Sequence, residues 1–342
     1  MIFHIIWFIL WGVLWAVFFM LEGFDFGAGI LHSFLGRNET EKGMIRRAIG
    51  PVWDGNEVWL ITAGGATFAA FPTTYALMFS YLYSALLLIL FALIFRGVAV
   101  EFRQKGQGAV WKKGWDTALF LGSFLPALLF GVAFGNIFQG LPMDAEGYHG
   151  TLFTLLNTYG LLTGLLFVLL FIVHGAIWIA LKTEGDLNRG ASQFAGTVWF
   201  LLLAIAVVFL IYTKFATNLY ANYFENIIWF IVPVIAVLSL LAIKVFAGKG
   251  QMLKAFFSSC LTIVTVTFTG VVGLYPNLIP SSIDPAYNLT IFNSSSSVYT
   301  LKIMTVVALI FVPVVIGYQI WTYKVFRHKV TAAEITEEGE TY

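Results

Sequence analysis

Charged residues are scarce in this chain. They make up 11% of its 342 residues, whereas hydrophobic residues make up 59%, and the mean hydropathy is +0.86. A soluble globular domain carries about 25% charged residues. So little charge cannot cover a water-facing surface, so we expect an integral membrane protein surrounded by lipid. The formal net charge of +1 gives no reason to expect a nucleic-acid partner.

The chain has one cysteine, and the common nucleotide and zinc motifs are missing. The single cysteine, Cys260, excludes an intramolecular disulfide and a cysteine-ligated metal site within the chain. There is no Walker motif, G-x-G-x-x-G loop or H-E-x-x-H sequence. The stretch 1–21 contains no Lys or Arg, whereas a secretory signal begins with positive charge. We therefore interpret the N-terminus as a first spanning helix.

Long apolar runs are abundant, and a spanning helix needs about 20 mostly apolar residues. The runs predict an all-α polytopic membrane protein with nine transmembrane helices. We place these helices at 5–34, 50–71, 75–95, 115–136, 151–181, 194–213, 226–247, 252–274 and 299–323.

Basic residues alternate between the two ends of these predicted helices. Every Lys and Arg except Lys214 and Lys302 falls after the first, third, fifth or seventh helix, or in the C-terminal tail. Loops on the cytoplasmic side of a membrane carry an excess of Lys and Arg. We therefore expect the N-terminus to lie outside and the C-terminus in the cytoplasm.

A weak internal similarity predicts how the helices are grouped. The segment Phe171–Trp178 resembles Phe19–Phe26, with His174 at the position of Glu22 and a glycine after each. This predicts two four-helix bundles with the same orientation and one further, peripheral helix. In one integral membrane domain (1–342), the expected parts are a pseudo-repeat of 1–136 and 151–274, the peripheral helix 299–323 and a short cytoplasmic tail, 324–342.

Four carboxylates lie where lipid-facing helices do not tolerate them. Glu22 and Asp25 fall in the first predicted helix, and Asp54 and Glu57 in the second. An ionised Asp at the bilayer centre costs about 2.5–3.5 kcal/mol, so four facing lipid would cost on the order of 10 kcal/mol. They must face protein, a water-filled cavity or a partner chain. The i, i+3 spacing places each pair on one helix face.

The expected orientation puts all four carboxylates in the cytoplasmic half, so we interpret them as a proton path from the cytoplasm. The alternative is a structural role, in which some of them pair with Arg46, Arg47 or backbone donors near the interface. Gly23 and Gly27 form a G-x-x-x-G sequence beside the first pair. Such glycines let membrane helices approach closely, so we expect the acidic face of this helix to be its packing face too.

Four other polar residues have both a structural and a functional interpretation. His32, close to the inner boundary, is either structural or a proton antenna. Arg96 is expected to anchor a loop or a carboxylate, and Glu101 to form an interfacial salt bridge. A histidine inside a membrane helix can ligate haem. His174 has no second ligand on this chain, which favours a buried, hydrogen-bonded histidine.

Several segments of the first 105 or so residues resemble subunit II of cytochrome bd-type ubiquinol or menaquinol oxidases. The segments are E-G-F-D-F-G-A-G at 22–29, L-G-R-N-E at 35–39, P-V-W-D-G-N-E-V-W-L-I-T-A-G-G at 51–65, F-A-A-F-P at 68–72, F-R at 95–96 and E-F-R at 101–103. The rest of the chain matches in length and helix count.

This resemblance implies a heterodimer with a haem-bearing subunit I in a bacterial or archaeal plasma membrane. Subunit I would hold two b haems and one d haem, while this chain ligates no cofactor and contributes no catalytic residue. A structural quinone and a small single-helix accessory subunit are further possibilities. By the same resemblance, Asp54 and Glu22 match positions assigned to proton transfer. Some relatives have Gln in place of Glu57, so a carboxylate there is an addition to the family pattern.

We therefore expect a subunit that supports the haem-bearing partner and delivers cytoplasmic protons for the reduction of O2 to water by quinol. A stand-alone proton-coupled secondary transporter is the alternative, since it would use similar carboxylates. A purely structural scaffold would not explain four acids buried on one side.

Overall fold

A computed structural model describes residues 1–337 of the chain. The last five residues of the predicted tail, 338–342, lie outside the described residues. The longer helices are α1 (Ile2–Leu35), α2 (Glu39–Ile49), α3 (Trp53–Ala70), α4 (Pro72–Tyr81), α5 (Tyr83–Phe102), α6 (Ala109–Gln139), α7 (Thr158–Lys182), α8 (Gly185–Ala216), α10 (Ile231–Gly248), α11 (Met252–Leu274) and α12 (Val298–Val325).

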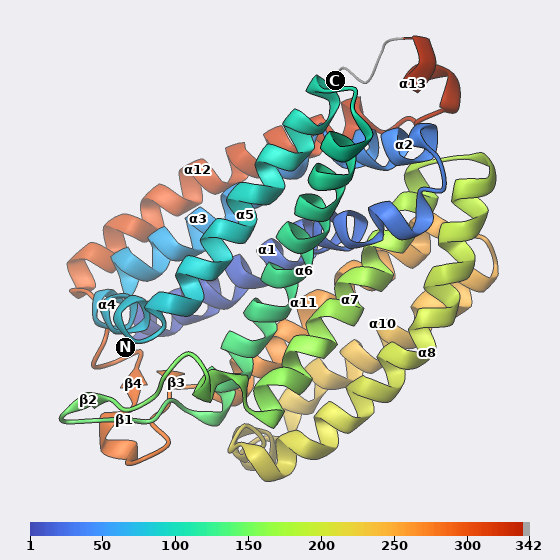
Figure 1. Ribbon diagram of the computed structural model, residues 1–342. Coiled ribbons are helices and arrows are strands. Elements are labelled where there is room, and N and C mark those ends of the chain that lie inside the picture. The colour runs from blue at the N-terminus through green and yellow to red at the C-terminus, as the bar shows by residue number, and fades with distance from the viewer. Residues whose placement is uncertain (338–342) are drawn as a thin grey trace.

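Short elements connect these helices. They are α9 (Ala221–Glu225), α13 (Ala332–Glu337) and the 3-10 turns η1 (Arg103–Lys105), η2 (Thr154–Leu156), η3 (Ile227–Phe230) and η4 (Pro285–Tyr287). Two small antiparallel pairs, β1 (Met143–Asp144) with β2 (Gly147–Tyr148) and β3 (Asn277–Ile279) with β4 (Leu289–Thr290), lie at the same end of the molecule as the N-terminus (Figure 1).

Helices α1 and α7 form the centre of the bundle. Helix α1 packs against α3, α6, α7 and α11, and Figure 1 shows it between the α3/α5 side and the α7/α8 side. In the most hydrophobic stretch of α7, 83% of the residues are buried. The corresponding share is 17% in α8 and 0% in α12. The outer helices therefore present their apolar surfaces to lipid or to a partner.

A close approach of glycines joins α1 to α7. A Cβ atom added to Gly27 would lie 1.8 Å from the carbonyl oxygen of Phe171 and 2.9 Å from the Cα of Gly175. No other residue fits at such a contact between two helix backbones. The G-x-x-x-G sequence therefore marks a packing face, as expected, but this face is turned toward α7.

The expected all-α, multi-pass architecture is confirmed. Eight helices among the described residues are long and apolar enough to cross a membrane. The predicted helix 50–71 forms as α3, but α3 is not one of these eight. It has 18 residues, which is about 27 Å at 1.5 Å per residue, and it carries Asp54 and Glu57.

Several predicted boundaries were wrong for local reasons. The expected helix 75–95 is two helices, α4 and α5, because the backbone at Leu82 (φ −101°, ψ 17°) leaves the helical conformation. The helix expected from residue 151 begins at Thr158, where the Asn157 side chain accepts a hydrogen bond from the Gly160 amide. Helix α8 begins at Gly185 rather than 194, and the amphipathic helix α2 was not predicted.

Candidate functional site

Glu22 and Arg96 meet inside the protein, between α1 and α5. A guanidinium nitrogen of Arg96 contacts a carboxylate oxygen of Glu22, and the other terminal nitrogen lies 3.3 Å from Oε2 of Glu57 on α3. The side chains of Glu22 and Arg96 are 0% and 3% exposed. Buried charges are stable only when they are paired, and here one guanidinium serves two carboxylates.

The walls around this ion pair are aromatic. The guanidinium carbon of Arg96 lies 4.7 Å from the ring centre of Phe26 and 5.9 Å from that of Trp53. Oε2 of Glu22 is buried and has no hydrogen-bond partner among the described residues. A buried carboxylate oxygen without a donor raises the free energy of the folded protein.

Asp25 belongs to a second, adjoining group. Its Oδ2 accepts a hydrogen bond of 2.7 Å from Nδ2 of Asn56, while Oδ1 of Asn56 accepts one of 2.7 Å from the hydroxyl of Tyr323 on α12. Asp25 and Asn56 are each 1% exposed. Asp25 also interacts electrostatically with Glu22 and Glu57. Glu22 and Asp25 are therefore buried close together, and Glu57, with a side chain 23% exposed, lies beside them.

Asp54 does not join them. Its side chain is exposed, and its Oδ1 accepts a hydrogen bond of 2.7 Å from the Gly55 amide in the first turn of α3. Glu57, one turn further along, is directed to Arg96. Asp54 therefore lies at the surface of this chain. Of the surroundings expected for these acids, a water-filled cavity or a partner chain remains for Asp54.

The acids and the glycines of α1 do not share a face, contrary to expectation. Glu22 and Asp25 point toward α5 and α3, whereas Gly23 and Gly27 contact Phe171 of α7. Successive residues turn by about 100° around a helix axis, so Gly23 and Gly27 lie about 150° from the acidic pair. One helix thereby serves two contacts with different chemistry.

A second charge cluster joins α1, α2, η1 and α6, and our sequence analysis did not find its centre, Asp116. Asp116 accepts from Nε of Arg103 at 2.5 Å and from Nζ of Lys42 at 2.8 Å. His32, 1% exposed, lies 3.0 Å from Nη1 of Arg46 and 3.6 Å from Oδ1 of Asp116. The available signal was a carboxylate inside a predicted spanning helix (115–136), the criterion that identified Glu22.

Glu39 extends this cluster to the surface of α2. Its carboxylate lies 3.2 Å from Arg103 and 3.1 Å from Lys112. Partial burial raises the pKa of Glu39, but the hydrogen bond from Lys112 and the nearby Arg103 charge outweigh this effect and hold the pKa below its ordinary value. The cluster therefore fastens α2 to η1 and α6.

His174 and Glu101 behave differently from each other. Nδ1 of His174 lies 2.6 Å from the Ser259 hydroxyl and Nε2 lies 3.0 Å from the Met20 carbonyl. Both ring nitrogens are used, which agrees with a hydrogen-bonded histidine and does not suit a haem ligand. The salt bridge expected for Glu101 does not form with any described residue, because the neighbouring Arg103 pairs with Asp116 and Glu39 instead.

Metal binding finds no support in the described residues. They contain no group of three or more His, Cys, Asp or Glu side chains placed to hold a metal ion. The clustered carboxylates are instead occupied by guanidinium, ammonium and amide donors, as the two clusters above show.

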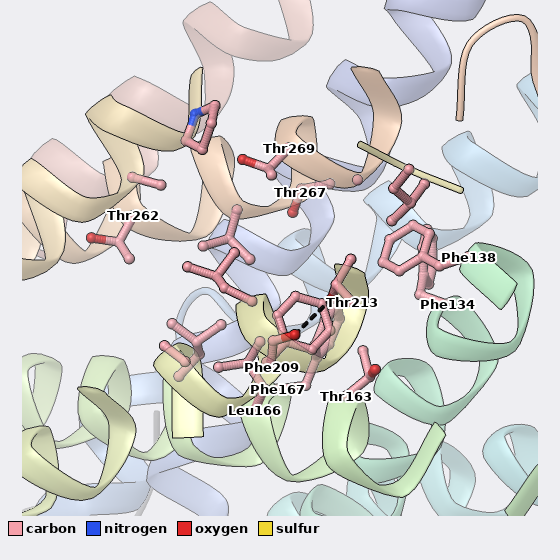
Figure 2. A pocket seen from close by; sticks show the side chains of 18 of the residues that line it. Phe134, Phe138, Thr163, Leu166, Phe167, Phe209, Thr213, Thr262, Thr267 and Thr269 are labelled. Carbon is pink, nitrogen blue, oxygen red and sulfur yellow. Dashed lines mark hydrogen bonds between the residues drawn. The ribbon is translucent and has the colours of Figure 1, made fainter. Parts of the chain in front are cut away.

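A separate apolar cavity of about 80 Å³ lies among α6, α7, α8, α10 and α11. Figure 2 shows Phe134, Phe138, Phe167 and Phe209 around it together with several threonines. The threonine hydroxyls donate hydrogen bonds to backbone carbonyls of their own helices, as in the 2.7 Å bond from Thr213 to the Phe209 carbonyl. Cavities lined in this way stay dry and accept apolar groups.

The long apolar helices define an all-α, multi-pass membrane protein, and acids gathered around one arginine lie inside it. The family model for cytochrome bd terminal oxidase subunit II matches residues 3–326. The chain therefore belongs to the cytochrome bd terminal oxidase subunit II family, which confirms the resemblance seen in the sequence, and it is a subunit of a respiratory oxidoreductase.

Individual relatives agree with this assignment. The chain is 39% identical to cytochrome bd ubiquinol oxidase subunit 2 of Bacillus subtilis, over 97% of this chain and 98% of that protein. It is 37% identical to cytochrome bd-I ubiquinol oxidase subunit 2 of Escherichia coli, over 96% of each. A chain of the bd oxidase structure from Geobacillus thermodenitrificans has the same fold, with a TM-score of 0.76, 16% identity, and coverage of 95% of this chain and 99% of that one.

Proposed function

We propose that this chain is the subunit of a bd-type quinol oxidase that supports a haem-bearing subunit I and supplies it with cytoplasmic protons for the reduction of O2 to water. The observation that carries the proposal is the pair of buried acids Glu22 and Asp25, with the partly exposed Glu57 beside them, near the single guanidinium of Arg96. This group has more acids than bases, and neighbouring buried carboxylates cannot all remain ionised. It therefore has the capacity to hold and pass on a proton.

The arrangement suggests a role for each residue. Glu22, with a buried carboxylate oxygen that lacks a donor, is the proposed proton carrier, and Asp25 is its neighbour in the path. Arg96 positions Glu22 and Glu57. Asp54, at the surface of α3, is placed to exchange protons with water or with a group of subunit I. The contribution of Glu57 rests on the contact with Arg96.

His32, Glu101 and His174 take supporting roles in this proposal. His32 lies in the cluster of Asp116 and remains the candidate proton antenna. His174 holds α7 to α1 and α11 through its two ring nitrogens. Since His174 is not available as a haem ligand, the two b haems and the d haem are assigned to subunit I, where they would supply the electron transfer.

The proposed topology follows from the basic residues. We propose that α3 crosses the membrane as a ninth span beside α1, with the N-terminus outside and the C-terminus in the cytoplasm. This arrangement places Arg46, Arg103 and Lys182 at the cytoplasmic side. It also places the proton path where protons are taken up from the cell interior.

The apolar cavity of Figure 2 is the proposed site of a structural quinone, whose isoprenoid chain matches its lining. Quinone extracted from the purified complex should fall when Ala206 is replaced by Phe, which fills the cavity. A single-helix accessory subunit remains a prediction from the resemblance.

Two measurements test the main proposal. The purified complex should show haem bands in a reduced-minus-oxidised spectrum, while a colourless single chain would contradict it. Asp54→Asn and Glu22→Gln should lower quinol oxidase turnover with haem content unchanged. Asp144→Asn, in β1 at the other end of the molecule, serves as the control and should leave turnover unchanged. If these variants instead lost haem from the complex, Asp54 and Glu22 would have a structural role. The transporter alternative has no support from the family to which the chain belongs.

A further inference from the structure

A second cavity opens where the spans α7 and α12 end, next to the end of α2. Its volume of about 140 Å³ is roughly ten times the space that one water molecule needs by the same measure. The residues lining it come from α2 and the turn after it, from α7, and from the chain that follows α12. The cavity therefore lies at the boundary between the membrane and water.

One side of this cavity is basic. Lys182 and His328 line it, and Arg47 lines it too but has a partner of its own. No Asp or Glu is among the described residues of the lining. Lys182 is 7% exposed, and its ammonium group donates to the carbonyls of Phe326 and, at 2.7 Å, His328. An ammonium group has three donors, so one is left for a ligand. Glu334 of α13 acts on Lys182 electrostatically but does not line the cavity.

The other side is apolar and already has its polar atoms occupied. The indole nitrogen of Trp178 donates to the Ala48 carbonyl at 3.0 Å, and the hydroxyl of Tyr323 donates to Asn56. Their ring surfaces and the side chains of Val52 and Val330 complete the wall. A ligand here meets positive charge on one side and hydrocarbon on the other.

We propose that this cavity binds the phosphate group of an anionic amphiphile, with the phosphate at Lys182 and His328 and the start of the acyl chains against Trp178 and Tyr323. Basic pockets between membrane helices recognise anionic lipid head groups. Free phosphate shares the charge but would leave the aromatic wall unused. Tyr323 also reaches Asn56 of the Asp25 group, but Lys182 and His328, which the test changes, make no printed contact with Glu22, Asp25 or Glu57.

The test measures lipid retained by the intact, purified oxidase complex. Native mass spectrometry would compare complexes incubated with phosphatidylglycerol, with phosphatidylcholine, or with phosphatidylglycerol plus excess inorganic phosphate. His328→Glu introduces a negative charge at an exposed side chain and carries little risk to folding. Lys182→Gln removes the buried ammonium. Lys324→Gln changes the charge by the same amount on the exposed side of α12 and is the matched control.

We expect phosphatidylglycerol to bind about fivefold more weakly to each of the two cavity variants, which is the effect of one basic residue near a membrane surface. The Lys324→Gln control should retain as much phosphatidylglycerol as the wild type. Complexes incubated with phosphatidylcholine should retain less lipid than those incubated with phosphatidylglycerol. If excess inorganic phosphate displaced the bound phosphatidylglycerol completely, the site would be one for free phosphate, and the proposal of an amphiphile would be overturned. Equal retention of phosphatidylglycerol by all variants, or equal binding of both lipids, would overturn the proposal.

Discussion

The guanidinium of Arg96 contacts the carboxylate of Glu22 across the interface of α1 and α5, and their side chains are 3% and 0% exposed. The same guanidinium reaches Glu57 on α3. Three helices are therefore linked through one buried cation. Removing one partner of a buried ion pair leaves an uncompensated charge and costs about 3–5 kcal/mol.

Arg96→Gln should accordingly lower the free energy of unfolding of this chain in the purified complex by about 3–5 kcal/mol, which appears as a lower unfolding temperature. The double variant with Glu22→Gln should recover a large part of the loss, because it removes the charge left without a partner. A thermal unfolding series of both single variants and the double variant measures this coupling. A double variant no more stable than Arg96→Gln would contradict the assignment of the pair.

Gly27→Ala should separate α1 from α7. The added Cβ would lie 1.8 Å from the Phe171 carbonyl oxygen, and overpacking of this kind costs about 1–3 kcal/mol. Gly64 is the control, since a Cβ there meets no atom within 4 Å. Gly64→Ala should leave the unfolding temperature unchanged or slightly higher, as Ala favours a helix. Equal effects of the two substitutions would show that the contact is not rigid.

Asp116→Asn should destabilise the end of the bundle formed by α2, η1 and α6. The substitution leaves Arg103, 1% exposed, with only Glu39 as an anionic partner, so we expect a loss of about 3 kcal/mol or more. The exposed pair of Asp186 and Arg189 provides the comparison, because surface ion pairs contribute about 0–1 kcal/mol. The unfolding temperature of Asp116→Asn should therefore lie clearly below that of Asp186→Asn, which should stay close to that of the wild type.

Glu39 should make a small contribution to stability that depends on pH. Its pKa is lower in the folded protein than the ordinary value of 4.5. The contribution is therefore present above pH 4.5 and is lost as the pH falls through the lower, folded-state pKa. Because the side chain is 52% exposed, its size should stay below about 1 kcal/mol.

The measurement compares the unfolding temperatures of the wild type and Glu39→Gln at pH 7 and at pH 3. The two proteins should differ at pH 7 and converge at pH 3. Glu225→Gln, at an exposed position outside the cluster, should match the wild type at both. A difference for Glu39→Gln that persists at pH 3 would mean that its interactions do not depend on charge.

The sequence predicted the parts of the fold that composition controls. Apolar runs identified the long helices, and the run at 252–274 coincides with α11. The break at Leu82 and the late start of α7 were missed because they depend on local backbone geometry, which apolar composition does not record. Helix α2 was missed because it is amphipathic and too short to span a membrane.

The candidate site was predicted in its residue types but only partly in its geometry. Burial of Glu22 and Asp25 followed from the cost of placing charge in lipid. The partners did not follow, because Arg96 and Tyr323 come from distant segments whose contacts depend on packing. Asp54 lies at the surface because the first turn of α3 directs it away from α1, and helix periodicity gives no absolute direction for a face.

The central claim is that Glu22 carries protons to the oxygen-reducing partner. Its most direct test reconstitutes the oxidase complex in liposomes and follows quinol-driven O2 consumption together with proton uptake from the cytoplasmic side. Glu22→Gln should lower both rates together by at least about tenfold, since proton-transfer groups contribute that much or more, with haem content unchanged and Glu146→Gln as the control. A Glu22→Gln complex that keeps its haems and both wild-type rates would contradict the claim.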